Sequence, residues 1–206
     1  MLRLTIALTL ILSGPALLAA DDGTGQRPPA DDGLATATFA AGCFWCVEEA
    51  FDKVGGVVET TSGFTGGDVA DPGYERVSAG GTGHTEALRV RYDPAAVTYE
   101  TLLDTFWHNV DPTDDGGQFC DRGSQYRSGI FVHDERQRRL AEASRKALRQ
   151  DPDAPSPIVT PIEDAGPFYP AEEYHQDYHE KNPIRYHVYK KLCGRAARLE
   201  ELWGDR

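Results

Sequence analysis

The stretch that most constrains the fold is FAAGCFWCVEEAFDKV, residues 39–54, where a strand-like segment runs into a helix. Residues 34–40 predict a strand, and a helix is predicted from about Cys43 to Val54. Apolar side chains share one face of this helix at helical spacing, and these are Phe44, Val47, Phe51 and Val54. The strand should therefore deliver Cys43 to the start of a helix that packs on a core, with Cys46 one turn further along.

The remaining pattern mixes strands and helices without strict alternation. Further strands are predicted at residues 57–64, 85–94, 126–134 and 156–164. Further helices are predicted at residues 98–110, 135–150, 171–182 and 194–203. This order predicts an α+β fold, a two-layer α/β sandwich with a mixed sheet.

Two segments of nearly twenty residues resist assignment to a helix or a strand. Residues 65–84 and 109–125 are rich in Gly, Asp and Pro. Loops of this length inside a compact domain are usually functional, since ordering them costs conformational entropy. We expect both to be active-site loops.

The N-terminus predicts export. Residues 1–20 combine one basic residue, Arg3, with an apolar run and a small-residue end, as in a secretory signal peptide. An uncleaved membrane anchor is the alternative, although the apolar run is short and interrupted for a span. Residues 21–33 are acidic and rich in Pro and Gly, which predicts a flexible linker, and residues 34–206 are left as one catalytic domain.

The charge excludes several classes of partner. The formal net charge is −12, and loss of Arg3 with the signal peptide makes it −13. Nucleic acid is not expected as a partner of so acidic a chain, and binding to anionic lipid is disfavoured.

The pair Cys43 and Cys46 allows several interpretations. A cysteine at a helix start can have a depressed pKa and act as a thiolate nucleophile, and a second thiol one turn away can resolve its oxidised form as a disulfide. Structural zinc would need a second pair at short spacing, but Cys120 and Cys193 are far apart in sequence. A thioredoxin-like motif, and a structural disulfide in a binding module, remain as alternatives.

Glu86 is a candidate acid. In GHTEALRVRY the period of two places Glu86 on the same face as Leu88, Val90 and Tyr92. A carboxyl buried without a cation has a raised pKa and can donate a proton at neutral pH. Glu86 pointing to solvent at the strand end is the other possibility.

Six segments together resemble the peptide methionine sulfoxide reductase A family over residues 36–203. They read GCFWC, GFTGG, GTGHTEALRVRYDP, QFCDRGSQYRS, FYPAEEYHQDYHEKNP and CGR, and they occur in the family's order. The resemblance implies that Cys43 is the nucleophile and that Phe44 and Trp45 hold the substrate methyl group. It also implies four residues around the sulfoxide oxygen, namely Glu86, Tyr74, Tyr126 and Asp121.

The resemblance further implies the activity and its requirements. The expected reaction is thiol-dependent reduction of methionine S-sulfoxide, free or in peptides, without a bound cofactor or metal and with an external thioredoxin-like dithiol as reductant. Many members have glycine in place of Cys46 and resolve with C-terminal cysteines, whereas GCFWC resembles the subgroup whose resolving thiol lies in the same motif. We therefore expect Cys46 to resolve the oxidised Cys43, because a one-turn separation closes most easily, and Cys193 is the second candidate. Cys120 is expected to be a small buried hydrophobe. A monomeric, periplasmic enzyme is expected.

Overall fold

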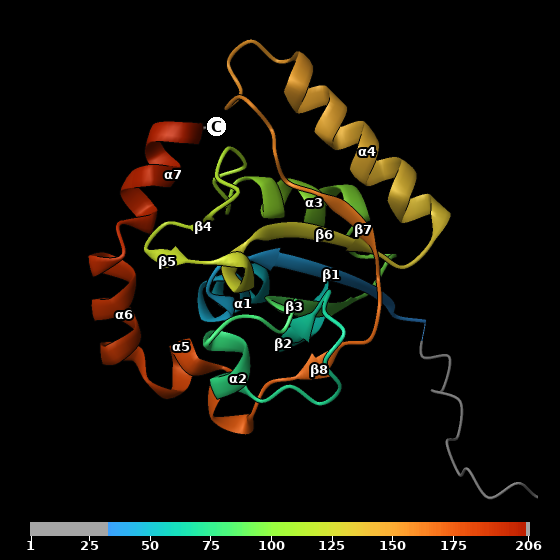
Figure 1. Cartoon of the computed structure of the whole chain (residues 1–206). Helices are drawn as coiled ribbons and strands as arrows, with labels where there is room; N and C mark the ends of the chain where they lie inside the picture. The colour runs from blue at the N-terminus through green and yellow to red at the C-terminus, as the bar shows by residue number, and fades with distance from the viewer. Residues whose placement is uncertain (1–32, 205–206) are drawn as a thin grey trace, which may run out of the picture. The chain divides into compact units, whose positions relative to one another are not determined.

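A six-stranded sheet forms the centre of the computed structural model, which describes residues 33–204 (Figure 1). The strand order is β7-β6-β1-β3-β2-β8, and β6 and β7 are parallel whereas the other neighbours are antiparallel. The strands are β1 Ala35–Ala41, β2 Val57–Thr65, β3 Thr85–Tyr92, β6 Ser128–Val132, β7 Ile162–Asp164 and β8 Tyr169–Pro170. This mixed sheet with its helices confirms the predicted α+β class.

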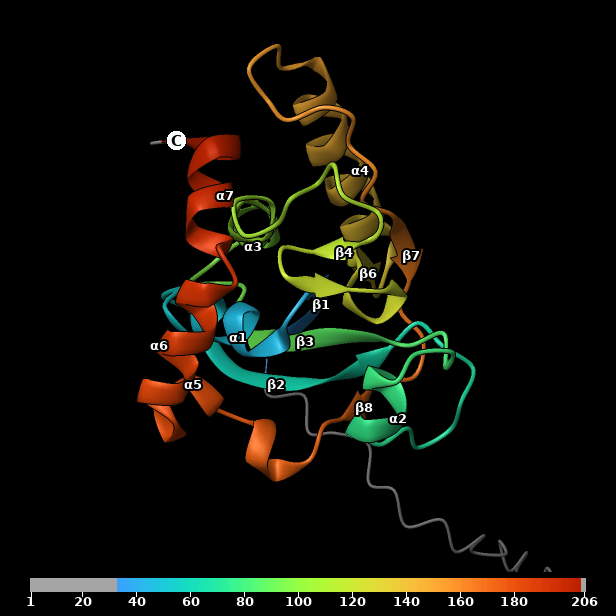
Figure 2. The same cartoon turned by 60° about the vertical axis from the view of Figure 1, so that its left-hand side comes forward.

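Helices α1, α3 and α4 pack on the sheet, and the C-terminal helices lie along one side of the molecule. They are α1 Phe44–Asp52, α2 Tyr74–Ser78, α3 Tyr99–Trp107, α4 Glu135–Gln150, α5 Tyr178–Lys181, α6 Pro183–Leu192 and α7 Arg195–Trp203, with 3₁₀ turns η1 Ser124–Tyr126 and η2 Glu173–His175. A small hairpin pairs β4 Gly117–Gln118 with β5 Asp121–Arg122. Helices α5, α6 and α7 lie one after another along the same side of the molecule in both views, with α7 at the top (Figures 1 and 2).

Aromatic side chains fix α1 and α3 on the sheet. Phe39 of β1 stacks with Phe51 of α1 at 5.1 Å between ring centroids and with Phe106 of α3 at 5.3 Å. All three are fully buried, and each such side chain contributes roughly 1.5–3 kcal/mol by leaving water. Helices α1 and α3 are therefore both packed firmly on β1.

The predicted elements differ from the structure mainly in the last third of the described chain. Only Ile162–Asp164 of the strand predicted at 156–164 is a strand, because prolines remove donors there. The helix predicted at 171–182 is divided into η2 and α5, and Asp177 between them has a left-handed backbone (φ +52°). Helix α6 was not predicted.

A disulfide ties the end of α6 to the β4–β5 hairpin. Cys120 is exposed and bonded to Cys193, so the prediction that Cys120 is a buried hydrophobe is wrong. Beside this bond, the guanidinium of Arg195 lies 4.4 Å from the ring centroid of Phe119 and donates to Ala41 O at 3.1 Å. The C-terminal helices are thus anchored to the same strand end that precedes Cys43.

Within residues 33–204, no helix has both the length and the apolar character that a membrane span requires. The predicted signal peptide and nearly all of the linker lie outside the described residues.

The Cys120–Cys193 disulfide should contribute measurably to stability. It closes a loop across a separation of 73 residues, so replacing both cysteines with serine should lower the free energy of unfolding by about 2–5 kcal/mol. Urea titration of the variant and of the wild type measures this. A dithiol should reproduce the loss in the wild type and have no such effect on the variant, and a loss below about 1 kcal/mol would contradict the prediction.

Candidate active site

The junction of β1 and α1 presents Cys43 at a helix start. Gly42 has φ +76°, and a Cβ there would lie 2.6 Å from Gln118 Cβ, so only glycine fits the turn. Cys43 is the N-cap residue of α1, and the Cys46 N–H donates to Cys43 O at 3.1 Å. The two cysteines therefore occupy the first turn of one helix, as the sequence predicted.

Glu86 lies directly beneath this helix start. Its Oε2 accepts a hydrogen bond from the Phe44 N–H at 3.0 Å, and the side chain is 3% exposed. Burial raises the pKa of Glu86 to about 8, the Phe44 N–H opposes this shift, and negative charge at Asp121 and Cys46 adds to it. The prediction that Glu86 shares the apolar face of its strand is confirmed, and at neutral pH the group is a neutral acid.

A small cavity joins the nucleophile candidate to this acid. Its volume is about 60 Å³, and its lining residues come from six different elements and from the α1 N-cap. They are Cys43, Phe44, Trp45, Tyr74, Glu86, Asp121, Tyr126 and Tyr189. The structure thus brings together all seven residues predicted for the nucleophile, the oxygen and the methyl group, and it adds Tyr189.

Three tyrosine hydroxyls and one carboxyl complete the polar side of the cavity. Burial raises the pKa of Tyr74 to about 12 and raises those of Tyr126 and Tyr189 further, so all three keep their protons at neutral pH. The Tyr189 hydroxyl donates to Asp121 Oδ2 at 2.5 Å. Burial raises the pKa of Asp121 while this hydrogen bond opposes the rise. Tyr74 and Tyr126 therefore offer hydroxyl donors in the cavity of the Glu86 carboxyl, while the Tyr189 hydroxyl is bonded to Asp121.

Aromatic contacts fix the apolar wall. Trp45 stacks on Tyr178 at 3.8 Å between centroids, and its Nε1–H donates to His175 Nδ1 at 3.1 Å. Burial lowers the pKa of His175, which favours the neutral ring that accepts this bond. Phe44 is fully buried and also lines the cavity, so it serves the core and the pocket together. The wall can hold a methyl group in a defined place.

The two thiols differ in their tendency to ionise. Burial, Cys46 and Glu86 raise the pKa of the Cys43 thiol, although a hydrogen bond with Tyr189 opposes this. The hydrogen bond with Cys43 lowers the pKa of Cys46 to about 7, with help from Arg195. The predicted depression of the Cys43 pKa is thus wrong for the reduced pair, because burial raises that pKa, and the hydrogen bond between the thiols favours negative charge on Cys46.

Sequence reasoning missed the residues of α5 and α6 that surround the cysteines. Tyr178, Tyr186 and Tyr189 lie against Cys43 and Cys46, with Trp45 packed among them. Tyr186 and Tyr189 are three positions apart, so they share a face only if residues 183–192 form a helix. Because that helix was not predicted, their spacing could not be interpreted.

Cys193 is bonded to Cys120 rather than free beside Cys43. The sulfurs of this disulfide and a carboxylate oxygen of Asp121 lie within 4.8 Å of one another. Metal ligation by cysteine requires thiolates, which this disulfide does not supply. The bond instead lies next to Asp121 and one helical turn from Tyr189.

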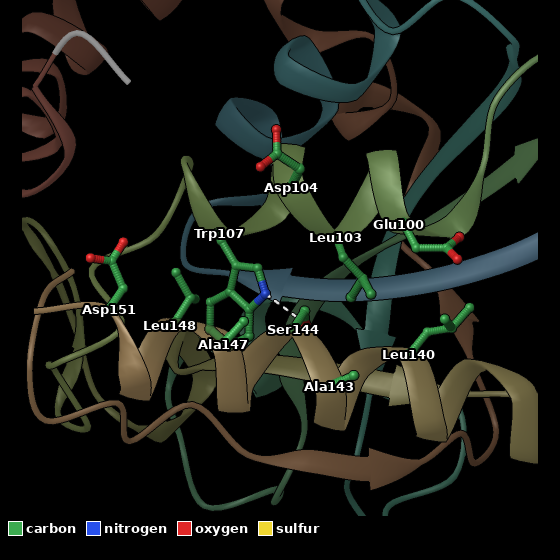
Figure 3. A pocket seen from close by; sticks show the side chains of 10 residues that line it. All are labelled: Glu100, Leu103, Asp104, Trp107, Leu140, Ala143, Ser144, Ala147, Leu148 and Asp151. Carbon is green, nitrogen blue, oxygen red and sulfur yellow. Dashed lines mark hydrogen bonds between the residues drawn. The ribbon is translucent and has the colours of Figure 1, made fainter. Parts of the chain in front are cut away.

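A larger cavity, of about 460 Å³, lies between α3 and α4 (Figure 3). Its floor is formed mainly by Leu103, Trp107, Leu140 and Leu148, and Trp107 Nε1–H donates to Ser144 Oγ. None of its lining residues is a cysteine or a histidine, and its carboxylates, such as Glu100 and Asp151, lie at the margin. The chemistry therefore belongs to the smaller cavity.

Comparison with known sequences agrees with this geometry. Residues 35–206 match the family model described as peptide methionine sulfoxide reductase. The chain is 52% identical over 170 residues to peptide methionine sulfoxide reductase MsrA of Bacillus pumilus, covering 82% of this chain and 96% of that protein. It is 52% identical over 168 residues to MsrA of Ligilactobacillus salivarius, covering 82% and 97%.

Solved structures are similar over most of their length. Mxr1 from Saccharomyces cerevisiae in reduced form aligns with TM-score 0.67 and 35% identity, covering 73% of this chain and 87% of that one. Methionine sulfoxide reductase A of Corynebacterium diphtheriae aligns with TM-score 0.65 and 34% identity, covering 75% and 77%. The chain belongs to the peptide methionine sulfoxide reductase A family.

Proposed function

We propose that this chain is a peptide-methionine (S)-S-oxide reductase that reduces methionine sulfoxide, free or in peptides and proteins, to methionine with electrons from thiols. The observation that carries the proposal is the shared cavity of Cys43, a buried neutral Glu86 and the Phe44–Trp45 wall. A sulfoxide needs a nucleophile at sulfur, a proton at oxygen and an apolar site for its methyl group. A thioredoxin-like disulfide oxidoreductase would need neither the acid nor the methyl site.

The first step is transfer of the sulfoxide oxygen to Cys43. Glu86 donates a proton to that oxygen, with Tyr74 and Tyr126 as hydrogen-bond donors. The Cys43 sulfur attacks the substrate sulfur after passing its proton to the Cys46 thiolate through their shared hydrogen bond. The S–O bond and the transient bond between the two sulfurs break as the oxygen passes to Cys43, so methionine is released and Cys43 becomes a sulfenic acid that carries the oxygen.

The second step is resolution within the same helix. Cys46 attacks the sulfenic sulfur, a Cys43–Cys46 disulfide forms, and the oxygen leaves as water. An external thioredoxin-like dithiol then reduces this disulfide, with no bound cofactor. Placement of both cysteines in the first turn of α1 supports Cys46 as the resolving thiol, whereas the bond to Cys120 disfavours Cys193.

We further propose that the enzyme is exported and works as a monomer in the periplasm. The pattern of residues 1–20 supports export, and the Cys120–Cys193 disulfide is of a kind that persists in oxidising compartments.

The roles proposed for the two cysteines predict different activities for their serine variants. Cys46→Ser should release about one equivalent of methionine per enzyme and then stop, because the sulfenic acid lacks its resolving thiol. Cys43→Ser should release none. Chromatographic quantification of methionine with and without thioredoxin checks both, because a small dithiol can reduce a sulfenic acid directly. Turnover of Cys46→Ser with thioredoxin at the wild-type rate would contradict the role of Cys46.

The acid role predicts a pH profile. Single-turnover methionine release should rise as the cysteine pair loses a proton near pH 7 and should fall as Glu86 loses its proton near pH 8. Glu86→Gln should lower the rate by about 10²–10⁴-fold and abolish the alkaline decline.

Glu48 is the matched control for this assignment, because burial raises the pKa of Glu48 to about 8 as well. Glu48 does not line the cavity, so Glu48→Gln should keep the alkaline decline at the same pH. Loss of the decline in Glu48→Gln alone would contradict the role of Glu86.

Export predicts the mature N-terminus. The protein recovered from a periplasmic extract should begin near Asp21, as measured by intact-mass spectrometry. Recovery of the full-length chain in the membrane fraction would instead support an uncleaved anchor.

A further inference from the structure

The two cysteines of the pair line two different cavities. Cys43 lines the substrate cavity of about 60 Å³, whereas Cys46 lines a second cavity of about 330 Å³. We name this second one the α1–α7 cavity, and it is lined by Cys46, Glu49, Ala50, Lys53, Asn109, Lys190, Arg195, Ala196 and Leu199. Tyr189 and Lys190, neighbours on α6, each line one of the two cavities.

The sizes of the cavities suit different molecules. About 60 Å³ lies well below the roughly 300–1,000 Å³ of ordinary ligand pockets, while about 330 Å³ falls within that range. The substrate cavity can admit a methyl sulfoxide group.

The α1–α7 cavity also has the charge that attracts a thiolate. It contains three cationic side chains, Lys53, Lys190 and Arg195, and one carboxylate, Glu49, in a chain of net charge −12. Glu49 is bonded to both Lys53 and Lys190, while Arg195 forms no ion pair that would neutralise it among the described residues and donates to the carbonyls of Ala41 and Asn109. An anionic nucleophile that approaches Cys46 is therefore stabilised by residual positive charge.

We propose, on the basis of the function proposed above, that the α1–α7 cavity is the entry site for the attacking thiolate of the dithiol reductant, which bonds to Cys46. The reductant sulfur forms a bond to Cys46 Sγ, the Cys43–Cys46 bond breaks, and its electron pair leaves with Cys43 as a thiolate. The second reductant thiol loses its proton and attacks the mixed disulfide. The reductant departs as a disulfide, and Cys46 is released as a thiolate that can take up the proton.

Leaving-group chemistry alone favours the opposite order, in which the reductant attacks Cys43 and Cys46 leaves. Cys46 has the lower pKa of the pair, so it would leave more readily than Cys43. The α1–α7 cavity nevertheless favours attack on Cys46, because it is the larger of the two cavities and carries the positive charge that attracts a thiolate. Separate entry also means that methionine in the substrate cavity does not block recycling.

Mapping of the mixed disulfide tests the proposal directly. The oxidised enzyme is mixed with a thioredoxin whose second active-site cysteine is replaced by serine, quenched with acid, alkylated and analysed by tandem mass spectrometry. We expect the thioredoxin on Cys46 and the alkyl group on Cys43. A bond between thioredoxin and Cys43 would overturn the proposal.

Filling the cavity gives a kinetic test. Ala196→Trp places a ring at the α7 side, so kcat/KM for thioredoxin should fall at least tenfold, while methionine release by the prereduced enzyme in a single turnover stays within about twofold. The matched control is Ala147→Trp, also an exposed helical alanine, which lines the α3–α4 cavity of Figure 3 and should change neither value. An equal loss in both single-turnover release and thioredoxin kinetics would overturn the proposal.

A charge reversal keeps the test valid if the tryptophan variant does not fold. Lys53→Glu changes a side chain that is 69% exposed, and it should raise KM for thioredoxin several-fold at low salt and much less at high salt. Lys146→Glu, the same change on exposed α4, should have no such effect. Failure of the proposed function would appear separately, as absence of methionine release from the prereduced wild type.

Discussion

The hydrogen bond from the Phe44 N–H to Glu86 Oε2 joins the start of α1 to β3, and the chemistry of the site depends on it. A helix start has N–H groups without partners inside the helix, and a carboxyl from the neighbouring strand satisfies one of them. The bond holds the acid beside the N-cap Cys43 at a point where two elements distant in sequence meet. Gly42 makes this possible, since no other residue fits the turn that aims α1 across the strand end.

Burial and the helix start act on Glu86 in opposite directions. The N–H favours the charged carboxylate, while loss of water favours the neutral acid, and burial dominates because the pKa rises to about 8. Relative to an ordinary glutamic acid, this amounts to about 5 kcal/mol in favour of the protonated form. The same burial raises the pKa of Cys43, so one cavity cannot by itself keep an acid protonated and a thiol ionised. The hydrogen bond between the two thiols lowers the pKa of Cys46, and Arg195 lowers it further. The negative charge of the pair is therefore favoured on Cys46 rather than on Cys43.

Local sequence patterns predicted most helices and strands in the first two-thirds of the domain. The period of two in β3 and the helical spacing in α1 placed Glu86, Cys43 and Cys46 correctly, because these elements bury one face against a continuous core. Helix α6 lacks such a pattern. Tyr186 is its one fully buried residue, whereas Ile184, Val188 and Leu192 face solvent, so its apolar residues give no signal of a core-facing helix.

Long-range contacts account for what the sequence could not predict. The Cys120–Cys193 bond joins positions 73 residues apart, and only the folded path of the hairpin and α6 brings them together. That segment also supplies Tyr189 to Cys43, and Lys190 and Arg195 to the side of Cys46. The N-terminal half of the domain thus contributes the reacting groups, and the C-terminal helices set the surroundings in which each sulfur ionises. Both thiols lie on one turn of α1, yet helices α6 and α7 place Tyr189 beside Cys43 and two cations beside Cys46. The C-terminal helices therefore give two adjacent sulfurs different surroundings.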